Sequence, residues 1–285
     1  SQIISNSIRL KFMSLSKVFY LSSEIEPFSD TYSLSDFSFK FGLEIKKIKE
    51  VDIRMCQPKY GYISERKYIL REVIRLKDLE VDFQSGVRTA NLKSAFIPQS
   101  RVQVYFMEDE EYFQPCSDLL YKSKNGRFLA DNYLKFAFFS QSVLFSLKKL
   151  FWSPEVIVSN DRQTSFIPML GKLHYQKDEF YKNIKYVHIV HSYNDWVNFS
   201  KDSFESLGLT SKSDLDFNNF CNPVKHADLT IILNDLNNPF IEMIRKSKYD
   251  NKILKASNHR VYDIDYGSPN TSEQIKSIIN DVRNL

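Results

Sequence analysis

The stretch KVFYLSSEIEPFSDTYSLSDFSFKFGLEIKKIKEVDIRMC, residues 17–56, indicates the fold of this chain. It opens with a short run of β-branched and aromatic residues followed by polar ones, which is typical of a buried strand that ends in a loop. Apolar residues then recur at three- and four-residue spacing, as on one face of a helix; they are Leu34, Phe37, Phe41, Ile45 and Ile48. A second apolar run, residues 51–56, ends before Pro58. This order predicts a βαβ unit of a parallel sheet.

The same alternation continues along the chain. Further strands are predicted at residues 102–106, 155–158, 185–191 and 227–233, and further helices at 131–152, 163–174 and 271–282. Two stretches break the pattern. Residues 68–83 and 87–97 alternate charged and apolar side chains around a Gln-Ser-Gly turn, which predicts a hairpin-like excursion, and the polar residues 196–222 predict a loop or lid. We therefore expect one α/β domain with a Rossmann-like, doubly wound parallel sheet.

Composition and charge exclude several classes of protein. The 285 residues include 23 Phe and 16 Tyr but only 7 Gly, which indicates an aromatic-rich folded protein. The net charge is +4 with both signs mixed along the chain, so no nucleic-acid partner is expected. No apolar run approaches the roughly 20 residues of a membrane span. Three widely spaced cysteines, Cys56, Cys116 and Cys221, are typical of buried thiols in the cytoplasm.

Candidate ligand-binding residues follow the predicted strands, because open parallel sheets bind ligands beyond the carboxyl ends of their strands. Glu24, Asp161, His191 and Ser192 occupy such positions. Each has a structural alternative: Asp161 could cap the helix expected near residue 163, and Glu24 could accept hydrogen bonds from loop amides. His191 is expected to point toward the crevice.

Two further patterns concern aromatic and histidine side chains. Tyr60 lies near a strand end and could stack on a sugar, although core packing explains most aromatic residues. His188 and His191 are three residues apart on one predicted strand and so lie on opposite faces, which predicts no metal site. No cofactor is predicted.

Several segments resemble starch and glycogen synthases. The opening stretch is similar to the family's first strand, which runs through Ser-Glu and Pro-Phe into a Lys-Thr-Gly-Gly-Leu-Ala-Asp loop. Similar segments follow in the family's order; they are QPKYG (57–61), FAFFS (136–140), WSPEVIVSNDRQTSFIPML (152–170), KYVHIVHS (185–192) and KHADLTIILND (225–235). The resemblance implies the N-terminal domain of a two-domain glycosyltransferase of the GT-B type, which moves glucose from ADP-glucose to an α-1,4-glucan.

The chain departs from the family in its phosphate-binding loop. Asp30, Thr31, Tyr32 and Ser33 stand where the family has Lys-Thr-Gly-Gly. In the family the lysine contacts the phosphates and the glycines let the backbone approach them. An aspartate here would repel a pyrophosphate, so the loop is expected to be degenerate.

Other family positions are retained. By the resemblance, Glu24, Asp36, Asp161 and His191 keep the family's residue types, and Ser192 replaces the asparagine of its His-Asn pair.

The expected domain organisation leaves three functions open. We expect residues 1–16 to be a leader or extension, residues 17–285 to form the synthase-like domain, and the family's C-terminal nucleotide-binding domain to have no counterpart. The functions are glucose transfer with a separate chain supplying that domain, a pseudoenzyme that binds a glucan or a protein, and another small-molecule activity. The loop favours the second. The expected partners are an α-glucan or ADP-glucose, and a separate C-terminal synthase domain or a second copy of the chain.

Overall fold

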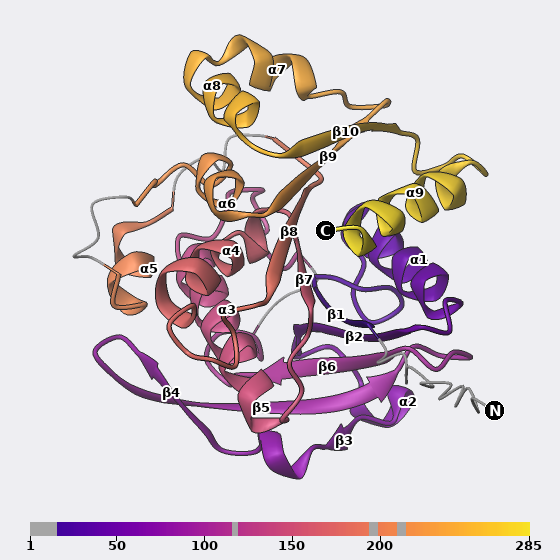
Figure 1. Ribbon diagram of the computed structural model, residues 1–285. Helices are drawn as coiled ribbons and strands as arrows, with labels where there is room; N and C mark the ends of the chain where they lie inside the picture. The colour runs from indigo at the N-terminus through magenta and orange to yellow at the C-terminus, as the bar shows by residue number, and fades with distance from the viewer. Residues whose placement is uncertain (1–15, 116–118, 194–198, 210–214) are drawn as a thin grey trace, which may run out of the picture.

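The computed structural model describes residues 16–115, 119–193, 199–209 and 215–285, and its centre is one mixed sheet (Figure 1). The parallel strands in spatial order are β10 (His259–Ile264), β9 (Leu229–Asp235), β8 (Lys185–Val190), β7 (Val156–Asn160), β1 (Ser16–Leu21), β2 (Val51–Pro58) and β6 (Gln103–Glu108). The α/β class and the single, mostly parallel sheet are confirmed. The expected leader lies outside the described residues except for Ser16, which begins β1.

One edge of the sheet is antiparallel. β5 (Gly86–Phe96) runs beside β6 and also pairs with β4 (Leu79–Phe83) and with the short β3 (Arg71–Glu72). Gln84 and Ser85 connect β4 to β5 with φ angles of 53° and 58°, as the right-handed twist of a tight hairpin requires. The predicted hairpin is therefore confirmed for residues 79–96.

Residues 68–78, predicted to belong to the first strand of this hairpin, do not form a continuous strand. Residues 68–78 contain the end of α2 (Glu65–Tyr68), β3 and a 3₁₀ turn, η1 (Ile74–Leu76). The prediction was wrong here because alternating charged and apolar residues also suit short, exposed turns at a sheet edge.

Helices cover both faces of the sheet, as Figure 1 shows. One face carries α1 (Leu34–Lys46) and α9 (Thr271–Arg283), which pack against each other. The other carries α3 (Asn132–Lys149), η2 (Arg162–Thr164), α4 (Phe166–Leu170), the π-helical turn η3 (Gly171–Tyr175), α5 (Lys201–Ser206) and α6 (Cys221–His226). Two short helices, α7 (Ile241–Lys246) and α8 (Lys248–Ala256), follow β9 and lead to β10. The sheet is thus doubly wound.

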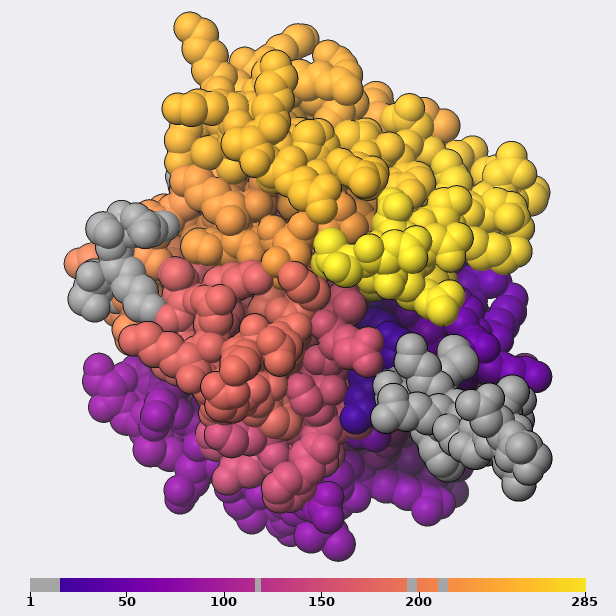
Figure 2. Space-filling view, in the orientation of Figure 1, coloured from indigo at the N-terminus to yellow at the C-terminus, as the bar shows by residue number. Residues whose placement is uncertain are grey.

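The last helix, α9, lies beside the first, α1. In the space-filling view of Figure 2, the C-terminal segment in yellow borders the N-terminal segment in indigo. The apolar faces of α1 and α9 account for this contact, since Phe37, Phe41, Ile275 and Ile279 are all buried. No helix among the described residues is long and apolar enough to cross a membrane.

The segment predicted as one helix, residues 163–174, is divided into η2, α4 and η3. Gly171 begins the last of these, and a Cβ atom there would lie 2.0 Å from Cζ of Tyr186. The glycine therefore lets the β8 tyrosine pack directly against the helical backbone. In the predicted loop at 196–222, α5 is present, while residues 194–198 and 210–214 lie outside the described residues.

Candidate ligand-binding site

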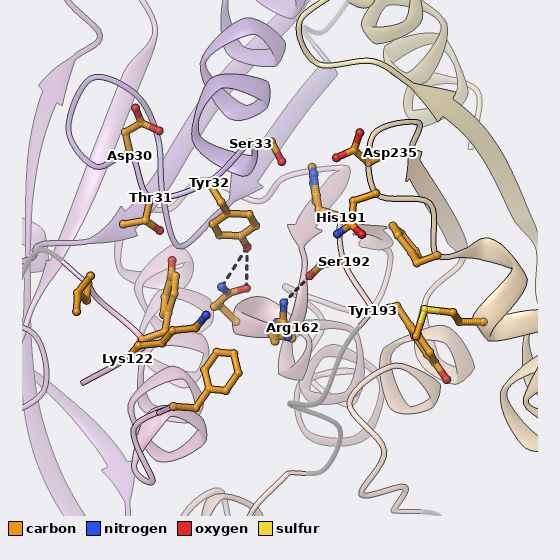
Figure 3. A pocket seen from close by; sticks show the side chains of 17 residues that line it. Asp30, Thr31, Tyr32, Ser33, Lys122, Arg162, His191, Ser192, Tyr193 and Asp235 are labelled. Carbon is orange, nitrogen blue, oxygen red and sulfur yellow. Dashed lines mark hydrogen bonds between the residues drawn. The ribbon is translucent and has the colours of Figure 1, made fainter. Parts of the chain in front are cut away.

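A pocket of about 640 Å³ opens at the carboxyl ends of β1, β7, β8 and β9 (Figure 3). It is lined by Asp30, Thr31, Tyr32, Ser33, Leu119, Tyr121, Lys122, Phe128, Arg162, Gln163, His191, Ser192, Tyr193, Asp235, Asn238, Phe240 and Met243. The parallel connections bring these strand ends to the same edge of the sheet, where α/β proteins commonly bind ligands. All four residues of the predicted degenerate loop lie in this lining.

Tyr32 extends from the loop after β1 into the pocket (Figure 3). Its hydroxyl donates a hydrogen bond of 2.8 Å to Oδ2 of Asp161 and accepts one of 3.1 Å from Nε2 of Gln163. The ring of Tyr121 lies edge-on to that of Tyr32, with centroids 6.3 Å apart. Burial, followed by the charge of Asp161, raises the pKa of Tyr32 well above its ordinary value, so its hydroxyl remains a donor.

Asp161 connects the loops that follow β7 and β8. Its buried carboxylate accepts hydrogen bonds from the Tyr32 and Ser192 hydroxyls, at 2.8 and 2.6 Å, and from the backbone N–H groups of His191 and Ser192, at 3.2 and 3.1 Å. Burial alone would raise the pKa of Asp161, but Arg162 and these donors outweigh it and lower the pKa.

The alternative role of Asp161 as a helix cap was wrong. Its side chain makes no capping hydrogen bond to η2. The backbone at Asp161 has φ of 57° and ψ of −171°, a conformation that non-glycine residues rarely adopt. The carboxylate bonds instead to His191 and Ser192, in the loop after β8. Such strain is common at ligand-binding sites.

His191 lines the pocket and is held in one tautomer. Asn160 donates through Nδ2 to the carbonyl oxygen of Leu21, so its Oδ1 accepts from Nε2 of His191 at 3.0 Å. Nδ1 of His191 then accepts from the hydroxyl of Tyr266 at 3.2 Å. Burial lowers the pKa of His191 to about 4, although Asp161 opposes the shift, so the imidazole is neutral at pH 7. A neutral imidazole does not attract an anion, and both ring nitrogens of His191 are already hydrogen-bonded within the protein. His191 therefore contributes a fixed ring to the pocket wall.

His188 lies two residues deeper in β8 than the strand's last residue. It contacts the hydroxyl of Ser159 at 2.8 Å, and burial lowers its pKa to about 3. Within the described residues, no group of three or more His, Cys, Asp or Glu side chains is placed to hold a metal ion.

Glu24 is not part of the pocket lining, but it contacts two residues that are. Its carboxylate accepts hydrogen bonds from the backbone N–H and the hydroxyl of Thr31 and from the hydroxyl of Tyr121. Burial, the largest cause, raises its pKa. Glu24 thus holds the loop of residues 30–33 in place, as its alternative structural role predicts.

Two other candidates lie away from this pocket. Asp36 is on α1, where it forms an ion pair of 2.7 Å with Lys40. Tyr60 is buried, donates a hydrogen bond of 2.7 Å to the carbonyl oxygen of Ser23 and packs edge-on against Phe113. Neither residue is part of the pocket lining.

Several residues that line the pocket were not identified as candidates from the sequence. Arg162 and Gln163 lie just after β7, and Asp235 is the last residue of β9, so the rule that identified Asp161 could have found them. Lys122 and Phe128 had no such signal, because they lie between β6 and α3 and reach the pocket through tertiary packing.

The sequence of this chain is similar to that of a known family of enzymes. The family profile described as starch synthase catalytic domain matches residues 17–231. The glycogen synthase of Chlorobaculum parvum is 31% identical over 256 residues, 87% of this chain and 52% of the relative. That of Pelodictyon phaeoclathratiforme is 37% identical over 176 residues, 62% of this chain and 36% of the relative. The chain thus spans about a third to a half of the length of these relatives.

A solved structure shares the fold. The catalytic domain of starch synthase IV from Arabidopsis thaliana, bound to ADP and acarbose, superimposes with a TM-score of 0.66 at 15% identity, covering 88% of this chain and 52% of that one. The matched profile covers most of the chain. The chain therefore belongs to the starch/glycogen synthase family and has the fold of a GT-B glycosyltransferase N-terminal domain.

Proposed function

We propose that this domain binds the sugar residues of an α-glucan in the pocket and does not itself transfer glucose from ADP-glucose. The hydrogen bond from Tyr32 to Asp161 carries the proposal. It places a phenol in the pocket at a position where, by the family resemblance, a glycine would let the backbone approach a phosphate.

The charge of the loop supports the same conclusion. Asp30 stands where the family has a phosphate-binding lysine, and it lines the pocket. A negative group beside a diphosphate is repelled, and the charge that develops on a leaving diphosphate would lack its stabilising cation. Loss of one such electrostatic contribution commonly lowers a rate by two to three orders of magnitude, roughly.

The pocket chemistry supports a sugar as ligand. Aromatic rings of Tyr32, Tyr121 and Phe240 accompany hydroxyl, amide and carboxylate groups in the lining. Sugars present apolar C–H faces and many hydroxyl groups, which such a mixture of rings, donors and acceptors can bind.

A second candidate function is glucose transfer by a complete synthase of which this domain is one half. The relatives named glycogen synthases favour it, since this chain matches about half or less of their length. In that case the domain would act with a C-terminal synthase domain, on the same or a separate chain, or with a second copy. We include a cytoplasmic location in the proposal, because Cys56 and Cys221 are buried thiols.

Binding measurements test the proposal. The purified domain would be titrated calorimetrically with maltooligosaccharides, ADP-glucose and ADP. We expect it to bind the maltooligosaccharides much more tightly than ADP-glucose or ADP. Tight binding of ADP-glucose with no binding of maltooligosaccharides would contradict the proposal and favour the second function.

A further inference from the structure

Two cationic side chains enter the pocket from the side opposite to its two carboxylates. In Figure 3, Lys122 and Arg162 lie on one side, whereas Asp30 and Asp235 lie on the other. The pocket is therefore polarised, although its four charged side chains balance. A ligand that matches this arrangement carries negative charge at one end and hydrogen-bond donors at the other.

Ser192, in the loop after β8, holds the guanidinium of Arg162 in the pocket. Its Nη2 donates a hydrogen bond of 2.6 Å to Oγ of Ser192 and lies 3.9 Å from Oδ2 of Asp161. A guanidinium carries five N–H donors in a fixed plane, so one that is oriented by a side chain can also bind the oxygens of an anion.

Arg162 lies 3.9 Å from the carboxylate of Asp161, so the charges of these two side chains oppose each other. Two hydroxyl groups and two backbone N–H groups donate hydrogen bonds to this carboxylate. Lys122 adds a further positive charge on this side, with its ammonium 4.8 Å from the ring centre of Phe128, and this side therefore carries a net positive charge.

The opposite side offers acceptors. Asp30 accepts a hydrogen bond from Oγ of Ser35 at 2.5 Å, and Asp235 accepts one from the backbone N–H of Asn237 at 2.9 Å. A carboxylate has about four lone-pair sites, so each of these groups can accept further hydrogen bonds, for which sugar hydroxyl groups are suitable donors.

We propose that the pocket takes a phosphorylated sugar, with the phosphate on Lys122 and Arg162 and the sugar hydroxyl groups toward Asp30 and Asp235. Phosphate contacts would thus come from the wall opposite to the loop of residues 30–33. This inference rests on the proposed function, because it assumes that the pocket binds a sugar. It adds that the sugar carries a phosphate group.

Four probes distinguish a sugar phosphate from a neutral sugar, a free phosphate and a nucleotide. Titration of the domain at low salt with glucose 1-phosphate, methyl α-glucoside, inorganic phosphate and ADP is expected to give the tightest binding for glucose 1-phosphate. Lys122→Gln is expected to weaken that binding about tenfold and Arg162→Gln at least as much, which is the size of one charge-assisted contact. Lys124→Gln, two residues away and outside the pocket lining, is the matched control and is expected to change it less than about twofold.

The outcomes that overturn the inference are distinct. Equal binding of glucose 1-phosphate and inorganic phosphate, tighter binding of ADP, or equal effects of Lys122→Gln and Lys124→Gln would each contradict it. Because Lys122 is exposed, its variant tests the proposal even if Arg162→Gln fails to fold. Binding of maltooligosaccharides without glucose 1-phosphate would overturn this inference alone, whereas binding of neither would overturn the proposed function as well.

Discussion

The Tyr32 hydroxyl donates a 2.8 Å hydrogen bond to Oδ2 of Asp161, and this contact joins the loop after β1 to the end of β7. The two residues are far apart in the sequence, but β1 and β7 are adjacent parallel strands, so their carboxyl ends meet. Asp161 in turn binds the loop after β8 through Ser192. One buried carboxylate thus fixes three of the segments that form the pocket.

Tyr32→Phe removes one donor from this carboxylate. We expect the free energy of unfolding at pH 7 to fall by about 1–3 kcal/mol, because a buried charged acceptor loses a hydrogen bond. Urea denaturation measures the change. Tyr249→Phe is the matched control, since Tyr249 donates to Asp216 in an exposed setting, and it is expected to cost less than about 1 kcal/mol. Equal effects of the two variants would contradict the role of Asp161 as a buried connector.

The stability of the domain is expected to fall as the pH falls from about 6.5 to about 4. The pKa of His191 is lowered to about 4 by burial, so the unfolded chain binds a proton in this range that the folded protein does not. The contribution of His191 to the free energy of unfolding is therefore complete above its pKa in the unfolded chain. It is lost as the pH falls toward its pKa in the folded protein, and the loss is at most about 3 kcal/mol.

Urea denaturation across this pH range tests the role of His191. His191→Gln, which keeps a side-chain amide in place of the imidazole, is expected to reduce the slope of stability against pH. An unchanged slope in the variant would show that His191 does not titrate as its burial requires.

Gly171→Ala is expected to destabilise the domain by about 1–3 kcal/mol, although alanine is the better helix former. The added Cβ would lie 2.0 Å from Cζ of Tyr186, a buried ring that has little room to move. Gly42→Ala in α1 is the matched control, because the atom that its Cβ meets is Sδ of Met55, at 2.7 Å, on a flexible side chain. Thermal denaturation of both variants measures the difference, and a larger loss for Gly42→Ala would contradict this packing argument.

The sequence predicts the parallel core because its buried strands are short apolar runs separated by helices. It does not predict β10, since this edge strand has mostly exposed or half-buried side chains and no apolar run. The segment expected as a helix at 163–174 is helical but changes type along its length, from 3₁₀ to α to π, which no local pattern predicts. The contact of Tyr186 with Gly171 is likewise tertiary.

The pocket is only partly predictable. The strand-end rule finds His191 and Ser192 in the lining and Asp161, which bonds to them, and the family resemblance finds the loop of residues 30–33. Lys122 reaches the pocket from a long connection whose position depends on tertiary packing, which no local pattern encodes.

Glucose transfer by a chimaera tests the central claim, that the loop of residues 30–33 prevents transfer, most directly. This domain would be joined to the C-terminal half of the Chlorobaculum parvum glycogen synthase, with that intact synthase as the positive control, and transfer of radiolabelled glucose from ADP-glucose to glycogen would be measured. The account predicts no transfer by the chimaera with its native loop, and measurable transfer after the combined substitutions Asp30→Lys, Tyr32→Gly and Ser33→Gly. Transfer by the native-loop chimaera at a rate similar to the intact synthase would contradict it.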